Sequence, residues 1–293
     1  MIKGLLKGYS ISKVSVIGAG QMGSGIAFVS LFKGDYKVKL IDISESNLSK
    51  ANSYIMSLLD KNIKKGVITD SDKERLLQNL TFSTYFEDCK DSELVVEAIN
   101  EVKETKFDLF KNISNIVSDT AILASNTSSI SISEISNYCN NPKRVIGMHF
   151  FNPVPVLNLV EIINADKTAS ETTERVKEIC KKIGKTSVIS KDSYGFITNR
   201  ILMPWINEAI ICLENGIATR EDIDTAMKLG TNVPMGPLTL ADFIGLDTCL
   251  SILEIMQKGL NDNKFKPSKL LIDMVSKGYY GRKSGKGFYD YSK

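Results

Sequence analysis

The sequence lacks several features that would each indicate a class of protein. It has one histidine (His149) in 293 residues, and no stretch approaches the ~20 apolar residues of a membrane helix. Its five cysteines form no Cys-x-x-Cys pair and have no metal-ligand spacing, and its first residues lack the apolar run of a signal peptide. We therefore expect no metal site, no membrane segment and a reducing compartment, the cytoplasm.

A charge excess of one sign is missing too. The 37 basic and 34 acidic residues leave a net charge of +3, which is too small to predict a nucleic-acid partner but suits an anionic small molecule. The hydrophobic content of 43% and the charged content of 24% are ordinary for a soluble globular protein, and the length suggests two domains.

Short apolar runs alternate with helical stretches over the first two thirds of the chain. Strands are expected at 13–18, 37–42, 94–99, 121–125, 145–149, 158–163 and 187–190. Helices are expected from the end of the first strand to about residue 33, and at 44–65, 70–79, 104–117 and 171–183. This alternation predicts an α/β fold, with a doubly wound, mostly parallel Rossmann-type sheet over residues 1–192.

After Asp192 the alternation stops. Helices are expected at 196–213, 220–229, 238–256 and 268–276, so residues 193–293 are predicted to form a second, smaller all-helical domain. The segment 196–213 is apolar nearly all round, which is typical of a buried helix. The apolar surplus of this domain suggests a dimer interface.

A glycine motif lies between the first predicted strand and the first predicted helix. Gly18, Gly20 and Gly23 fit the pattern G-x-G-x-x-G in the context that makes such a match informative. The three glycines permit a tight turn, close approach of the backbone to a pyrophosphate, and close packing of helix on strand. The N-terminus of the helix offers free N–H groups to phosphates. We expect a dinucleotide site here, with Gln21 and Met22 as part of the turn.

Asp42 ends the second predicted strand, 19 residues after Gly23. A carboxylate at this place binds the ribose hydroxyls of the adenosine half of the dinucleotide. The following residues, from Ile43 to Asn47, include no basic partner for an additional phosphate, so NAD is predicted rather than NADP. In the alternative interpretation, Asp42 caps the helix that begins near Ser44.

His149 ends a predicted buried strand and is followed by Asn152-Pro-Val-Pro155, which can continue neither a helix nor a central strand. Open α/β sheets place their ligands at such strand ends. A dehydrogenase that acts on an alcohol needs a base for the hydroxyl proton, and imidazole is suited to that task. Glu161 interrupts an apolar run and is expected to orient the second ring nitrogen. The alternative is a hydrogen-bonded core histidine.

The chain resembles the L-3-hydroxyacyl-CoA dehydrogenase family, and is most similar to its short bacterial members that act on 3-hydroxybutanoyl-CoA. Matching segments occur in the expected order over nearly the whole chain. In the first domain they are Val16-Ile-Gly-Ala-Gly-Gln-Met-Gly-Ser-Gly-Ile-Ala27, Leu94-Val-Val-Glu-Ala-Ile99, Ala124-Ser-Asn-Thr-Ser-Ser129 and Gly147-Met-His-Phe-Phe-Asn-Pro-Val-Pro155. Beyond it they are Gly195-Phe-Ile-Thr-Asn-Arg-Ile-Leu202, Pro234-Met-Gly-Pro237, Leu240-Ala-Asp-Phe-Ile-Gly-Leu-Asp247 and Gly281-Arg-Lys-Ser-Gly-Lys-Gly-Phe-Tyr-Asp290.

The resemblance implies a role for each residue that matches the family's pattern. His149 is the base and Glu161 its partner, while Ser128 and Asn199 hydrogen-bond the substrate oxygens. Further residues implied at the cofactor are Glu101, Lys106 and Asn126, and those implied at the acyl-CoA substrate are Asn152, Lys61 and Lys65, with Lys64 beside them. Ser128 can also be interpreted as a helix cap, and the three lysines as a solvated helix face.

The implied reaction is the reversible, NAD-dependent oxidation of a 3-hydroxyacyl-CoA, as in fatty-acid β-oxidation or butyrate metabolism, by a homodimer that associates through the helical domain. Two alternatives remain open. One is a related β-hydroxyacid dehydrogenase that acts on a free acid, although such enzymes generally use a lysine base. The other is a non-catalytic NAD-binding protein, which the full set of catalytic positions disfavours.

Overall fold

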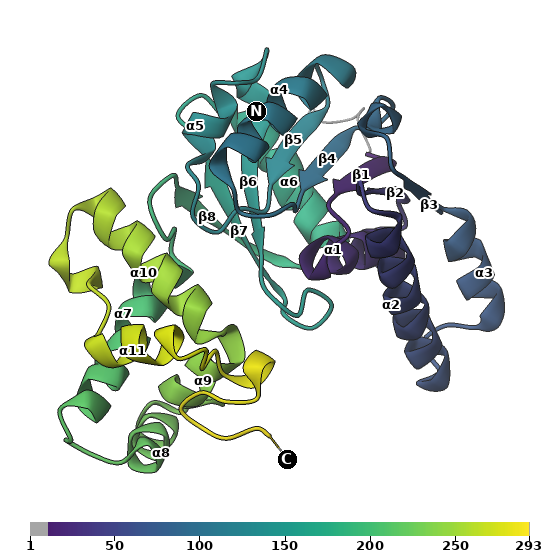
Figure 1. The fold of residues 1–293 in the computed structure, drawn as a ribbon. Coiled ribbons are helices and arrows are strands. Elements are labelled where there is room, and N and C mark those ends of the chain that lie inside the picture. The colour runs from purple at the N-terminus through teal and green to yellow at the C-terminus, as the bar shows by residue number, and fades with distance from the viewer. Residues whose placement is uncertain (1–10, 293) are drawn as a thin grey trace, which may run out of the picture. The chain divides into compact units, whose positions relative to one another are not determined.

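The computed structural model describes residues 11–292, which form two compact units that meet in sequence at Ser193 and Tyr194 (Figure 1). The segment 1–10, in which the sequence predicts no signal peptide, lies outside the described residues, as does Lys293. Within residues 11–292, no helix combines the length and the apolar composition needed to cross a membrane.

The first unit is built on an eight-stranded sheet in the order β3-β2-β1-β4-β5-β6-β7-β8. All neighbouring strands run parallel except β6 and β7, which are antiparallel. The prediction of an α/β fold with a mostly parallel sheet is therefore confirmed. The strands are β1 (Lys13–Ile17), β2 (Lys37–Ile41), β3 (Leu80–Ser83), β4 (Leu94–Glu97), β5 (Ile122–Ser125), β6 (Val145–Phe150), β7 (Leu159–Asn164) and β8 (Thr186–Lys191).

Helices cover both faces of this sheet, as a doubly wound fold requires. They are α1 (Gln21–Phe32), α2 (Glu45–Lys64), α3 (Asp70–Gln78), α4 (Lys103–Ile116), α5 (Ile132–Ser136) and α6 (Ser170–Lys182), with short 3-10 turns η1 (Phe86–Cys89) and η2 (Pro142–Arg144). Helices α1, α2 and α6 pack against one face of the sheet and form a single apolar core with it. The strand residues Val96, Ala124 and Met148 point into this core. On the other face, Gly147 lies against Ile132 of α5.

The alternation of side chains along the strands places four polar residues on that second face. Successive residues of a strand point to opposite faces, and the neighbours of these four belong to the first core. The four are Glu97, Ser125, His149 and Glu161. All four are buried. Glutamate side chains are rarely buried unless they are paired, so Glu97 and Glu161 are expected to have partners.

The second unit is all-helical among its described residues. Its helices are α7 (Thr198–Glu214), α8 (Arg220–Thr231), α9 (Pro237–Ile244), α10 (Leu246–Leu260) and α11 (Lys269–Ser276), with 3-10 turns η3 (Asn263–Phe265) and η4 (Arg282–Ser284). They enclose a core of their own that includes Met203, Ile206 and Phe265.

Several predicted elements need correction. The short strand β3 and the single-turn helix α5 were not predicted, because each is too short for a clear periodic pattern. The helix predicted at 238–256 is two helices, since Gly245 has φ +106°, outside the helical region, and separates α9 from α10.

In the isolated chain, the segment 196–213 is buried on one side only, which differs from the prediction of a helix that is buried all round. Its helix begins at Thr198, and Ile201 on it is 68% exposed in the isolated chain. The buried side of the helix instead includes two amides, Asn199 and Asn207. Counting apolar residues does not separate the side that packs on the core of this unit from the side that is exposed in the isolated chain.

Candidate active site

The glycine motif forms the turn between β1 and α1. Gly18 has φ +103°, and a Cβ there would lie 2.4 Å from the carbonyl oxygen of Ala98. A Cβ on Gly23 would lie 1.7 Å from the carbonyl oxygen of Gly18, so the helix packs directly on the turn. Gly20, by contrast, has no atom within 4 Å of its Cβ position. Two glycines are thus required by the fold itself, and the third leaves open space.

Helix α1 begins at Gln21 with no side-chain cap and no acidic residue in its first turn. Its first N–H groups therefore keep their capacity to bind an anion. Gln21 is exposed and Met22 is half-buried, so both border this end of the helix. The uncapped end and the open space at Gly20 fit the pyrophosphate of a dinucleotide.

Asp42 directly follows β2 and is held beside the glycine turn. Its Oδ2 accepts the Ala19 amide at 2.7 Å, and its Oδ1 accepts the Ser44 amide at 2.9 Å and the Asn47 side chain at 3.2 Å. The cap of α2 is Ser44, whose hydroxyl accepts the Asn47 amide. The alternative interpretation of Asp42 as the helix cap is therefore excluded, and its contact with a ribose stays a prediction.

His149 and Glu161 face each other across the antiparallel pair β6 and β7, where they are directly paired in register. His149 Nδ1 lies 2.8 Å from Glu161 Oε2, and the two side chains are 5% and 0% exposed. The other ring nitrogen, Nε2, lies 3.2 Å from Ser128 Oγ. The Phe151 ring lies 4.5 Å from the imidazole, centroid to centroid. A buried imidazole is thus held between a carboxylate and a half-buried hydroxyl.

Ser128 belongs to the turn that follows β5, and it does not cap a helix: Ser131 caps α5. Asn126 in the same turn accepts the Phe150 amide through Oδ1 at 2.8 Å. This bond ties the turn to the end of β6, one residue beyond His149. Asn126 and Ser128 are therefore placed by the same local structure.

Glu101 and Lys106 lie at the Ser128 turn, Glu101 in the loop after β4 and Lys106 on α4. Glu101 Oε1 accepts the Ser128 amide at 2.9 Å. The Lys106 side chain is 1% exposed, and its ammonium contacts Glu97 and lies 3.2 Å from Glu101 Oε2. The geometry thus turns Lys106 toward two carboxylates, and its predicted contact with the cofactor stays a prediction.

The remaining predicted residues are more scattered. Asn152 is exposed in the loop after β6. Lys61, Lys64 and Lys65 are exposed at the C-terminal end of α2. Asn199 is 7% exposed in the first turn of α7, which belongs to the second unit. The roles of these residues at a substrate stay predictions.

Sequence reasoning missed several residues that support the site. Lys185 is buried and donates to the carbonyl oxygens of Val154 and Leu157 at 2.5 and 2.7 Å. Gly25 on α1 leaves room for Val154, whose Cβ would lie 2.8 Å from a Cβ at that position. The loop after His149 is thus fixed from two sides, one of them the helix of the glycine turn. Glu97 was missed too, although it ends an apolar run much as Glu161 interrupts one.

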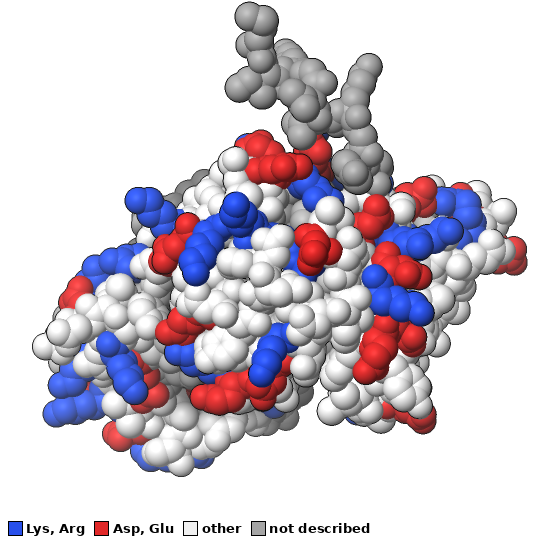
Figure 2. All heavy atoms as spheres, turned by 90° about the horizontal axis from the view of Figure 1, so that it is seen from above, with Lys and Arg blue, Asp and Glu red and all other residues white. Residues whose placement is uncertain are grey.

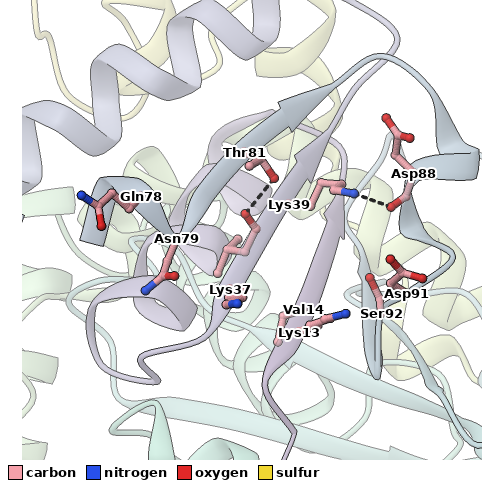
Figure 3. A pocket seen from close by; sticks show the side chains of 11 residues that line it. Lys13, Val14, Lys37, Lys39, Gln78, Asn79, Thr81, Asp88, Asp91 and Ser92 are labelled. Atoms are coloured by element: carbon pink, nitrogen blue, oxygen red, sulfur yellow. Dashed lines mark hydrogen bonds between the residues drawn. The ribbon is translucent and has the colours of Figure 1, made fainter. Parts of the chain in front are cut away.

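A pocket of about 200 Å³ lies elsewhere on the first unit (Figure 3). It is lined by Lys13 and Lys37, the first residues of β1 and β2, and it therefore lies at the end of these strands opposite the glycine turn. Lys39 at this pocket donates to the Asp88 carbonyl at 2.7 Å. On the face shown in Figure 2, basic and acidic side chains are interspersed, with no broad field of one sign.

A dinucleotide turn and a buried histidine–carboxylate pair on one Rossmann-type sheet define the class of nicotinamide-dependent dehydrogenases. Residues 13–193 match the family described as 3-hydroxyacyl-CoA dehydrogenase, NAD binding domain, and residues 195–291 match the C-terminal domain of 3-hydroxyacyl-CoA dehydrogenase. The chain belongs to the 3-hydroxyacyl-CoA dehydrogenase family. It is an oxidoreductase whose cofactor is NAD, as its Gly18, Gly20, Gly23 and Asp42 predicted.

Similar proteins match over nearly their full length. The chain is 50% identical to the probable 3-hydroxybutyryl-CoA dehydrogenase of Deinococcus radiodurans, over 95% of this chain and 100% of that protein. It is 46% identical to the 3-hydroxybutyryl-CoA dehydrogenase of Bradyrhizobium diazoefficiens, over 96% of each. The crystal structure of (S)-3-hydroxybutyryl-CoA dehydrogenase PaaH1 from Ralstonia eutropha matches with a TM-score of 0.93 and 45% identity, over 97% of this chain and 100% of that one.

Proposed function

We propose that this chain oxidises (S)-3-hydroxybutanoyl-CoA to acetoacetyl-CoA reversibly, with His149 as the general base in oxidation and the general acid in reduction. The observation that carries the proposal is the buried contact between His149 and Glu161, with the second ring nitrogen facing Ser128. The names of the similar proteins from Deinococcus radiodurans and Ralstonia eutropha supply the acyl group and its configuration.

The two ring nitrogens of His149 are proposed to have different tasks. Glu161 as a carboxylate only accepts, so Nδ1 carries the proton and Nε2 of the neutral ring keeps its lone pair. Nε2 takes the 3-hydroxyl proton, and Glu161 stabilises the imidazolium that forms. NAD, when bound, accepts the hydride in oxidation, and NADH supplies it in reduction. Ser128 Oγ, 3.2 Å from Nε2, is placed to hydrogen-bond the oxygen that loses its proton.

The other substrate contacts follow the family pattern. Asn199, in the helical unit, is proposed as a second donor to the substrate oxygens, and Asn152 as a further contact. Lys61 and Lys65, with Lys64, are proposed to meet the phosphates of coenzyme A, since their exposed ammonium groups suit an anionic ligand. The first unit is accordingly proposed as the NAD-binding domain, and the helical unit as the substrate and dimerisation domain.

The requirement for the thioester is tested by following NADH consumption with acetoacetyl-CoA and, separately, with free acetoacetate. We expect turnover of the thioester and kcat/KM for the free acid lower by about a thousandfold or more, because the free acid lacks the binding energy of the coenzyme A moiety. Equal turnover of both compounds would favour the free-acid dehydrogenase. Binding of NADH without turnover of either compound would favour a non-catalytic protein.

Replacement of Asp42 by alanine is expected to weaken NADH binding by about tenfold, or ~1.4 kcal/mol, and to weaken NADPH binding far less. The carboxylate accepts ribose hydroxyls in NADH but repels the additional phosphate of NADPH. The measurement is the Kd of each nucleotide by fluorescence titration. Asn47→Ala is the matched control, because it removes a hydrogen bond to Asp42 while keeping the carboxylate. An equal loss for both nucleotides in Asp42→Ala would reject this role.

We also propose that the protein is a homodimer that associates through its helical unit. Large apolar side chains are exposed there on the isolated chain, namely Ile201 at 68%, Ile217 at 71% and Leu229 at 79%. Ile201→Glu is expected to produce a monomer by light scattering at micromolar concentration, because a charge would be buried in the interface. Val67→Glu, at an exposed position in the first unit, should remain dimeric. A monomeric parent protein would contradict the proposal.

A cytoplasmic location is proposed as well. Among the described residues all five cysteines are unpaired, and Cys89, Cys139, Cys180 and Cys249 are buried. Unpaired buried thiols are typical of proteins that work in a reducing compartment.

A further inference from the structure

A second charge cluster, with Glu97 and Lys106 buried and Glu101 at the surface, lies on the same face of the sheet as His149 and takes no part in the steps proposed above. Glu97, the last residue of β4, is 0% exposed, and Lys106 on α4 is 1% exposed. The Lys106 ammonium contacts Glu97, lies 3.2 Å from Glu101 Oε2 and lies 3.4 Å from the Ile99 carbonyl oxygen. One ammonium thus joins two carboxylates in a place where an unpaired charge is strongly disfavoured.

Glu101 uses its other oxygen to hold the turn after β5. Its Oε1 accepts the amides of Ser128 and Ser129 at 2.9 and 3.0 Å. It also accepts the hydroxyls of Thr127 and Ser129 at 2.5 and 2.9 Å. One carboxylate oxygen therefore gathers four donors from three consecutive residues. Such an arrangement sets the backbone of the turn, including the Ser128 amide.

Glu97 holds the same turn from the strand side. Its Oε2 accepts the Ser125 hydroxyl at 2.6 Å, and Ser125 Oγ in turn accepts the Thr127 amide at 3.2 Å. Its Oε1 accepts the Ile99 amide at 2.8 Å, which fixes the loop that leads to Glu101. Glu97 and Ser125 are also direct neighbours in the register of β4 and β5. The segment from Ser125 to Ser129 is therefore bound at both ends by one charge network.

We propose that Glu97, Lys106 and Glu101 are positioning residues, which fix the turn so that Ser128 Oγ stands at His149 Nε2. This inference rests on the proposed function, because it assigns the network a task in the chemistry of Ser128 and His149. Lys106 acts by holding both carboxylates, each of which binds a different part of the turn. The network thereby determines where the substrate oxygen meets its hydrogen-bond partner.

The protonation state of Glu101 agrees with this role. Burial by itself raises the pKa of this carboxyl group, but the Lys106 ammonium and hydrogen bonds from Thr127, Ser128 and Ser129 outweigh burial and lower it. Glu101 is therefore ionised at neutral pH and accepts from all its donors.

The test uses Glu97, because its side chain is 0% exposed and its hydrogen bonds go to the Ile99 amide, Lys106 and Ser125. Glu97→Gln removes the charge that holds Lys106 while keeping the shape of the side chain. We expect kcat for acetoacetyl-CoA reduction to fall by about ten- to a hundredfold through misplacement of Ser128. The KM for the thioester and the Kd for NADH should stay within about a factor of two.

A double-mutant cycle separates positioning from a general structural role. If Glu97 acts through Ser128, the variant Glu97→Gln/Ser128→Ala should be no slower than Ser128→Ala alone. A full and independent loss in the Ser128→Ala background would overturn the proposal. An unchanged kcat in Glu97→Gln would overturn it as well. Glu93→Gln, at the residue directly before β4, is the matched control, since its carboxylate accepts hydrogen bonds only from Ser12 and Lys13 in the described structure.

If Glu97→Gln does not fold, the milder variant Ser125→Ala takes its place in the test. Ser125→Ala deletes the hydroxyl between Glu97 and the Thr127 amide. It should lower kcat in the same direction, and again without additional loss beside Ser128→Ala. Additive losses would reject the network. If Ser128→Ala and His149→Ala both retain the parent kcat, the proposed function fails and not the network alone.

Discussion

Replacement of His149 by alanine is expected to lower kcat for acetoacetyl-CoA reduction by about a thousandfold, within the range known for a positioned acid or base. No other histidine exists in the chain to replace it. The Kd for NADH should stay within about twofold, because the loss concerns proton transfer in the transition state. The measurement pairs initial rates at saturating thioester with a fluorescence titration of NADH.

Two further variants serve as comparisons, one at the residue before His149 and one at its hydrogen-bonding partner. Met148→Leu changes the adjacent residue of β6, which points into the opposite core, and should keep kcat within about twofold because it conserves volume. Glu161→Gln keeps the shape of the partner but removes the charge that stabilises the imidazolium, so we expect an intermediate loss of about a hundredfold. If His149→Ala retained more than about a tenth of the parent kcat, the assignment of the base would be wrong.

Gly23→Ala is expected to destabilise the protein by ~3 kcal/mol and to abolish measurable NADH binding. The new Cβ would lie 1.7 Å from the Gly18 carbonyl oxygen, which is backbone and cannot move aside without deforming the turn. Because α1 starts at this turn, the same displacement moves its first N–H groups. Thermal unfolding and NADH titration of the purified variant measure the two effects.

Gly20→Ala is the matched control for this prediction, with the opposite effect on stability. Nothing lies within 4 Å of its Cβ position, and its φ of −69° is open to any residue. The variant should unfold at the parent temperature or slightly above it. It should nevertheless bind NADH about tenfold more weakly, because the methyl group occupies the space of the pyrophosphate. Parent-like NADH binding in Gly20→Ala, or parent-like stability in Gly23→Ala, would contradict the account of the turn.

The sequence predicted the sheet well where local patterns are strong. The first parallel strands are short runs rich in valine, leucine and isoleucine, each of which ends in or is followed by a glycine or an acidic residue. Such runs need no tertiary information to be recognised. The strand β3 was missed because only Leu80 of its four residues is buried. At the edge of a sheet, pairing with a neighbour decides the strand, and pairing is not visible in a local pattern.

Two buried glutamates of the candidate site carry the same signal in the sequence. A charged residue inside an apolar run drew attention to Glu161, and the same signal was present at Glu97. The direction of the Lys106 side chain could not be predicted, since it depends on how α4 packs beside β4 and β5. The exposure of Ile201 was missed for a related reason, because composition does not show which side of a helix faces its neighbours.

Hydride transfer to the thioester can be followed by the mass of the product formed in ordinary water from acetoacetyl-CoA and NADH deuterated at nicotinamide C4. Each of the two C4 positions is labelled in turn. We expect 3-hydroxybutanoyl-CoA that carries deuterium at C3 with one of the two labelled forms. The hydride goes to the carbonyl carbon, whereas the proton that His149 delivers to oxygen exchanges with water. Unlabelled product with both forms, or reduction of acetoacetate in place of the thioester, would contradict the proposed function.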